Sequence, residues 1–288
     1  MLTVDDPRDD PEKRRGKTII IDCGPDLSGW TGRHGLADLL EAFGSYIDYA
    51  KIATLNAAIL PETYLKETLR QYKSAGIKTF AGGLLFEYAY LKNDVSGLIA
   101  LLDHLELGGI EVSENYVSLT SDERKRHIDQ LVAAGIEVVF EYGQKFPDEP
   151  LDLADLDRVI HEVSTLGVQH VVLEQGECDL LAAKRPDEFE AMKSAEWMDR
   201  VFIEVETGEF PKPQIDLIER FGPDVNIANV APAHVYKLEM LRRGRGRWID
   251  YPFFRDLVAS HGGSGPSGAG QHDAFEKPDR DPDQKADG

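Results

Sequence analysis

The strongest constraint on the fold is a repeat, in which a short apolar segment and then a helical segment occur eight times in roughly 225 residues. The predicted strands span residues 18–22, 46–52, 77–81, 110–113, 136–141, 168–174, 201–205 and 225–230. The predicted helices span residues 36–43, 61–74, 86–107 with a break near 93, 121–134, 153–166, 186–197, 214–221 and 232–243. Strands that alternate with helices in this way are typical of a parallel sheet covered by helices.

Eight such units predict an α/β protein with a (β/α)8 barrel of the TIM type, as a single domain over residues 17–258. An open doubly wound sheet is the alternative, because the number of strands alone does not prove closure. That alternative predicts a glycine-rich phosphate fingerprint after the first strand, and Gly24-Pro25-Asp26 does not match one. Residues 1–16 and 259–288 are charged and contain proline or glycine, so we predict disordered tails there.

The formal charge of −20 restricts the partners of this chain. Phosphate backbones require a basic patch, so we expect no nucleic-acid partner. A solvated acidic surface and adaptation to high internal salt both explain the charge. The sequence has no apolar run long enough to span a membrane, its first residues are charged, and it has only two cysteines. We therefore expect a cytoplasmic protein without a membrane partner, and we expect it to form a homo-oligomer.

Charged and amide side chains gather where the predicted strands end. In a barrel of this type the active site is built at the carboxyl ends of the strands. Several carboxylates that converge on one mouth repel one another unless a cation lies among them, and an oxygen-only ligand set favours Mg²⁺. The strand-end residues are Asp22, Lys51, Glu111, Glu141, Glu174, Glu204 and Asn229. We predict Glu111, Glu141 and Glu174 as the metal ligands; structural ion pairs with Lys51 or Lys145 are the alternative.

The remaining site predictions concern catalysis and anion binding. We assign catalytic roles to Lys51, Lys145 and Glu204, because a lysine in a barrel mouth can bind an anion or transfer a proton. The segment 220–230 carries two asparagines in an otherwise apolar strand, and these either present amides to a ligand or cap the following loop. The predicted substrate-binding residues are Asn226, Asn229, Arg33 and Lys212, the last of which is equally explained as a solvated surface lysine.

Several motifs, in the same order along residues 17–250, resemble the phosphosulfolactate synthase family. They are Gly82-Gly83-Leu84-Leu85-Phe86-Glu87, Glu111-Val112-Ser113, Glu141-Tyr142-Gly143 with Lys145, and the segments 221–230 and 238–244. The resemblance implies a TIM-type barrel and a Mg²⁺-dependent addition of sulfite to phosphoenolpyruvate, a small anionic substrate. The product would be phosphosulfolactate, on the way to coenzyme M, and the enzyme would be a carbon–sulfur lyase. Plant heat-stress proteins resemble the same family.

This chain departs from the family pattern at two cations and one loop. Cys23 stands where the family usually has a lysine, and Gly176 stands where an arginine is expected. Residues 53–57 replace a glycine-rich stretch, and Arg33 and His34, in the loop after the first strand, are the candidates to compensate for the missing cations. Three hypotheses follow: a divergent phosphosulfolactate synthase, a barrel enzyme that acts on a different, less anionic acceptor, and a non-catalytic stress or interaction protein.

Overall fold

The computed structural model describes residues 15–25, 32–143, 147–249 and 251–261. Within these residues, eight parallel strands form a closed barrel in sequence order, and β1 pairs with both β2 and β8. The strands are β1 (Thr18–Asp22), β2 (Tyr49–Ile52), β3 (Lys78–Ala81), β4 (Gly109–Val112), β5 (Glu137–Tyr142), β6 (His170–Glu174), β7 (Val201–Glu204) and β8 (Ile227–Val230). The predicted barrel is thus confirmed and the open sheet is excluded. The predicted tails lie almost entirely outside the described residues, so their disorder stays a prediction.

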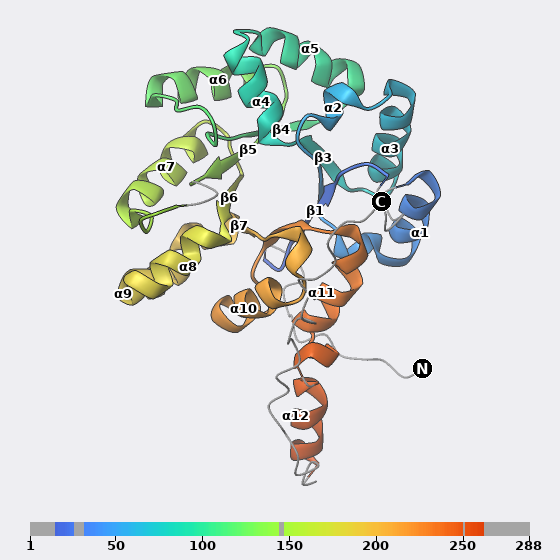
Figure 1. The fold of residues 1–288 in the computed structure, drawn as a ribbon, viewed down its shortest axis with the longest axis vertical. Helices are drawn as coiled ribbons and strands as arrows, with labels where there is room; N and C mark the ends of the chain where they lie inside the picture. Colours follow the sequence, from blue (N-terminus) through green and yellow to red (C-terminus); the bar gives the residue numbers. More distant parts are fainter. Residues whose placement is uncertain (1–14, 26–31, 144–146, 250, 262–288) are drawn as a thin grey trace, which may run out of the picture.

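Helices surround the barrel, and the last of them stands away from it (Figure 1). They are α1 (Arg33–Phe43), α2 (Asn56–Ile59), α3 (Glu62–Ser74), α4 (Gly83–Leu91), α5 (Val95–Leu105), α6 (Ser121–Ala133), α7 (Leu153–Thr165), α8 (Gln175–Lys184), α9 (Pro186–Lys193), α10 (Lys212–Phe221), α11 (Val235–Arg242) and α12 (Pro252–Ser260). In the described part of the chain, no helix is long and apolar enough to cross a membrane.

The helix boundaries differ from the predicted ones where local signals are weak. Helix α8 directly follows β6, where no helix is predicted. Its sequence has no clear apolar face, which explains why periodicity did not reveal it. The predicted helix 186–197 ends at Lys193 and is followed by the 3-10 helix Glu196–Arg200. The start of α6 was predicted correctly, because Thr120 and Glu123 form a reciprocal capping box there.

Two apolar cores follow from the alternation of side chains along each strand. One core lies between the sheet and the helices and contains residues from every strand. The other fills the barrel interior with Ile19, Tyr49, Phe80, Val139, Val172, Phe202 and Ala228. Side chains two residues further along the same strands face the same interior, nearer its carboxyl end. The inner core therefore lies directly beneath any site at the barrel mouth.

His170 contacts this inner core and is held there in its neutral form. Its Nε2 lies 2.8 Å from the hydroxyl of Tyr49, and its ring packs against Tyr49 and Phe202. Burial, and secondarily the charges of Lys17 and Lys78, lower the pKa of His170 to about 4. A depressed histidine pKa contributes stability that is present above the unfolded pKa of about 6.5 and is lost as the pH falls toward 4.

We predict that His170→Gln reduces the acid sensitivity of the fold. Between pH 7 and 4.5 the free energy of unfolding of the unsubstituted protein should fall by about 2–3 kcal/mol more than that of the variant. Urea denaturation at both pH values measures this difference, and glutamine keeps an acceptor for Tyr49. The exposed His161 provides the control, since His161→Gln should retain the full pH dependence. An unchanged pH dependence in His170→Gln would contradict the prediction.

Candidate active site

A layer of charged side chains lies above the inner apolar core, at the carboxyl ends of the strands. Val139, Val172 and Phe202 each belong to the inner core, and a glutamate follows each of them two residues later on the same strand. Because the barrel is closed, the inward-facing side chains at these strand ends converge on the barrel axis. The layer consists of Lys51, Glu111, Glu141, Glu174 and Glu204, all of them buried. The structure therefore brings together all of the predicted strand-end charges except Asp22.

Lys51 is the centre of this layer. Its Nζ lies 2.9 Å from Oε2 of Glu111 and 2.9 Å from Oε2 of Glu204. Burial lowers the pKa of Lys51, but the charges of Glu111 and Glu204 outweigh this effect and raise it above its usual value. The ammonium is therefore charged at neutral pH and holds two carboxylates in place.

Glu141, Glu174 and Glu204 form a set that could hold a metal ion. Each offers one carboxylate oxygen, and these oxygens lie within 4.8 Å of one another. The predicted set contained Glu111 in place of Glu204. Glu111 lies outside this set and accepts hydrogen bonds from Lys51 and from the backbone N–H of Gly83, at 3.0 Å.

The electrostatics of the set favour a cation. Burial, followed by the charges of Glu111 and Glu204, raises the pKa of Glu141 to about 8. Burial also raises the pKa of Glu111, although Lys51 opposes this effect. Carboxyl groups that are hard to ionise for these reasons gain most from a bound cation, which offsets both burial and mutual repulsion. The residues present thus fit a hard divalent metal ion.

Asn115 is a site residue that the sequence analysis missed. It follows β4 by three residues, and its Nδ2 donates a hydrogen bond of 3.1 Å to Oε1 of Glu141. Its Oδ1 is buried and has no hydrogen-bond partner among the described residues. A polar side chain just beyond a strand end was the available signal, since such loops face the barrel mouth.

The two asparagines of β8 have different places in the structure. Asn229 is buried near the carboxyl end of β8, has a left-handed backbone with φ of 57°, and has an Oδ1 without a partner in the described part of the chain. Asn226 precedes β8 at the opposite end. Its amide binds the backbone of Lys17, Asp199 and Val201, so it ties the strand ends together away from the mouth.

The other predicted cations do not join the layer in the described structure. Lys212 begins α10 with an exposed side chain and pairs with Asp216 at 2.5 Å. Arg33 begins α1, and its side chain is outside the described part of the structure. Lys145 also lies outside the described residues. Asp22 faces α3 instead of the mouth, because the hydroxyl of Tyr72 donates to its Oδ2 at 2.8 Å.

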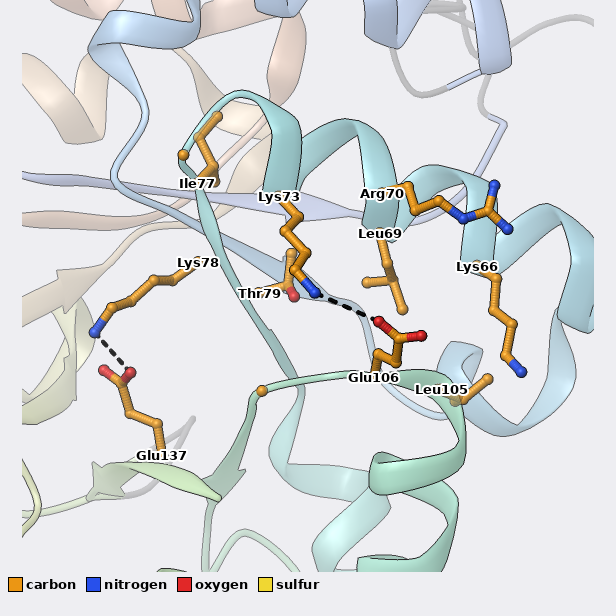
Figure 2. A pocket seen from close by; sticks show the side chains of 12 residues that line it. Lys66, Leu69, Arg70, Lys73, Ile77, Lys78, Thr79, Leu105, Glu106 and Glu137 are labelled. Carbon is orange, nitrogen blue, oxygen red and sulfur yellow. Dashed lines mark hydrogen bonds and ion pairs between the residues drawn. The ribbon is translucent and has the colours of Figure 1, made fainter. Parts of the chain in front are cut away.

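A cavity of about 420 Å³ lies at the amino-terminal side of the barrel, away from these carboxylates. Figure 2 shows Lys73 pointing toward Glu106 and Lys78 toward Glu137, at 3.4 and 2.8 Å. These side chains are largely exposed, and such surface ion pairs contribute about 0–1 kcal/mol. We therefore assign the candidate active site to the buried layer of charged side chains and not to this cavity.

We predict that Lys51→Met destabilises the protein by about 3–5 kcal/mol, because it leaves Glu111 and Glu204 buried without their cation. Urea denaturation measures the loss, and millimolar Mg²⁺ should restore part of it by binding to the folded state. The matched control is Lys125→Met, which removes an exposed lysine on α6 and should change stability by less than about 0.5 kcal/mol. A Lys51→Met protein as stable as the parent would contradict the assigned role of Lys51.

Comparison with known proteins agrees with the sequence resemblance. The model of the family described as (2R)-phospho-3-sulfolactate synthase (ComA) matches residues 6–247. The phosphosulfolactate synthase of Methanocaldococcus jannaschii is 30% identical over 242 residues, which cover 80% of this chain and 92% of that protein. The phosphosulfolactate synthase of Methanothermobacter thermautotrophicus is 28% identical over 247 residues, which cover 83% and 92%. The chain therefore belongs to the phosphosulfolactate synthase family, a family of enzymes.

Proposed function

We propose that the protein catalyses the Mg²⁺-dependent addition of sulfite to phosphoenolpyruvate, giving phosphosulfolactate for coenzyme M synthesis. The observation that carries this proposal is the buried layer in which Lys51 contacts Glu204, one of three glutamates suited to a metal ion. Membership of the family supports the same activity. The layer stands at the carboxyl end of a closed barrel, where enzymes of this architecture place their chemistry.

Glu141, Glu174 and Glu204 are the proposed ligands of Mg²⁺. Their donors are all carboxylate oxygens, which hard cations prefer, and the set contains no histidine or cysteine. When bound, Mg²⁺ would act as a Lewis acid that stabilises negative charge on the substrate carboxylate. Glu204 also holds Lys51, so it would place the ammonium and the cation next to each other.

Lys51 is the proposed acid of the reaction. The sulfur lone pair of sulfite would form a bond to the methylene carbon of phosphoenolpyruvate, and the double-bond electrons would move toward C2 and the carboxylate. The ammonium would then deliver one proton to C2, and the resulting amine would regain a proton from solvent. Glu111 and Glu204 hold the ammonium at its position, as the two 2.9 Å contacts indicate.

Phosphate, carboxylate and sulfite are all anions, so the substrates need further contacts. We propose that Asn229, Arg33 and Lys145 supply them, together with Asn115 at the same mouth. The position of Asn229 at the end of β8 supports its role, because phosphate groups commonly bind after the last two strands of such barrels. We do not include Lys212 and Asn226, whose side chains are engaged elsewhere.

A second candidate is an enzyme of the same family that acts on a less anionic acceptor. In the described residues, Lys51 is the one cationic side chain of the layer and faces four buried carboxyl groups. Cys23 and Gly176 also stand where the family resemblance leads us to expect cations. Each absent charge could remove a few kcal/mol of Coulomb attraction, on the order of 4 kcal/mol at 4 Å before desolvation.

We also propose a cytoplasmic homo-oligomer. Cys23 is exposed and Cys178 is buried, and in the part of the chain that the structure describes they form no disulfide, which suits a reducing compartment. Trp248, Phe254 and Leu257 near the end of the described chain expose apolar side chains, which suits contact with another protein surface.

The decisive experiment incubates the protein with Mg²⁺, phosphoenolpyruvate and sulfite at low and high salt, and detects phosphosulfolactate by mass spectrometry. We expect product with the unsubstituted protein and a loss of at least about 100-fold with Glu174→Gln, because one metal ligand is removed. The control, Lys125→Met, should retain full activity. Metal binding without product at either salt would favour the different acceptor, and absence of both would favour a non-catalytic protein.

A further inference from the structure

Residues 113–116 belong to the loop that follows β4 at the barrel mouth. This loop places Asn115 beside Glu141. The amide of Asn115 donates to Oε1 of Glu141, which is one of the three carboxylates that could hold a metal ion. A loop residue can orient a carboxylate only if the loop itself has a fixed conformation. The contacts that fix this loop therefore determine the geometry of the site.

Glu87 on α4 supplies those contacts. Its side chain is 2% exposed and accepts hydrogen bonds from three groups of the loop. The hydroxyl of Ser113 and the backbone N–H of Asn115, at 3.0 Å, donate to Oε1, and the backbone N–H of Tyr116, at 2.8 Å, donates to Oε2. A single buried carboxylate thus binds Ser113, Asn115 and Tyr116.

Further contacts hold the loop on both sides. Helix α4 approaches so closely that a Cβ at Gly83 would collide with Oγ of Ser113. The backbone N–H of the same Gly83 donates to Glu111, the partner of Lys51. On the far side, Glu114 pairs with Arg124 of α6 at 2.8 Å. The loop is therefore attached to α4 and α6, and α4 contacts the charged layer directly.

We propose that Glu87 is a positioning residue of the active site, which acts through Asn115 on Glu141. This inference rests on the proposed cation set of Glu141, Glu174 and Glu204. Glu87 fixes the backbone of Asn115, and the amide of Asn115 then sets the orientation of the Glu141 carboxylate. The Oδ1 of Asn115 is buried without a partner in the described chain, so the amide retains an acceptor for a bound ligand.

A purely structural role for Glu87 makes a different prediction. Loss of three hydrogen bonds to a buried carboxylate would lower stability in either case. Only a role that acts through Asn115 predicts that substitutions of the two residues have overlapping effects on cation binding. A double-mutant cycle separates these explanations, because independent effects multiply and effects through one hydrogen bond do not.

The experiment titrates Mn²⁺, as a probe of the Mg²⁺ site, into the full-length protein by isothermal calorimetry. Glu87→Gln keeps the size of the side chain but places an NH₂ group against the donors of the loop, and Asn115→Ala removes the bond to Glu141. Each variant should bind Mn²⁺ about tenfold more weakly, as is common for residues that support metal ligands. The double variant should bind no more weakly than about tenfold, where independent effects would give about 100-fold.

The control is Glu239→Gln, which alters another buried glutamate; Glu239 lies on α11 and pairs with Arg243. It should lower the melting temperature without changing the Kd for Mn²⁺. If Glu87→Gln does not fold, Glu87→Asp replaces it, since it shortens the side chain but keeps its charge.

An unchanged Kd in the Glu87 variant, or a multiplicative loss in the double variant, would overturn the proposal. Absence of Mn²⁺ binding to the unsubstituted protein would overturn it together with the proposed cation set. Because the readout is cation binding, a failure of the sulfite reaction is detected separately by the product assay.

Discussion

The contact of the Lys51 ammonium with Glu111 and Glu204 is the interaction on which the barrel mouth depends. Carboxylates that are withdrawn from water in a single layer repel one another and become harder to ionise, as the raised pKa of Glu141 indicates. One ammonium offsets part of this repulsion and fixes two of the side chains. The layer still contains more carboxyl groups than cationic side chains in the described residues, which explains its suitability for a metal ion.

The surroundings of this layer make its charges effective. Below it, aromatic and aliphatic side chains such as Tyr49, Phe80 and Phe202 fill the barrel interior and exclude water. Electrostatic interactions are stronger in such an environment than in solvent. Beside it, Glu87 and Gly83 on α4 connect the outer helices to Asn115 and Glu111. The position of each carboxylate is therefore set by packing outside the layer as well as by the strands.

The acidic character of the mouth also bears on which substrate the site can bind. An enzyme that binds several anions needs cationic groups. This chain has Cys23 and Gly176 at two positions where the family resemblance predicts cationic side chains. Arg33 and His34 are the sequence candidates that would replace those charges. A metal ion bound to Glu141, Glu174 and Glu204 would supply the remaining attraction. The balance between these cations and the carboxylates distinguishes the two proposed activities.

The sequence by itself determined the barrel and the gathering of charge at its mouth. Periodicity identified the strands, because alternation of apolar and polar residues is a local property of the chain, and strand ends located Lys51, Glu141 and Glu174. Only the tertiary structure decided how those charges pair. The three carboxylates whose oxygens lie within 4.8 Å of one another include Glu204 and not the predicted Glu111, and Asn115 contacts Glu141, because these relations depend on distances across the barrel. Asn226 and Asn229 show the same limit: three residues apart in sequence, they lie at opposite ends of β8. A sequence pattern predicts which face of a strand a side chain occupies and how near it lies to the end of the strand. Which residue it contacts depends on how the eight strands pair to close the barrel.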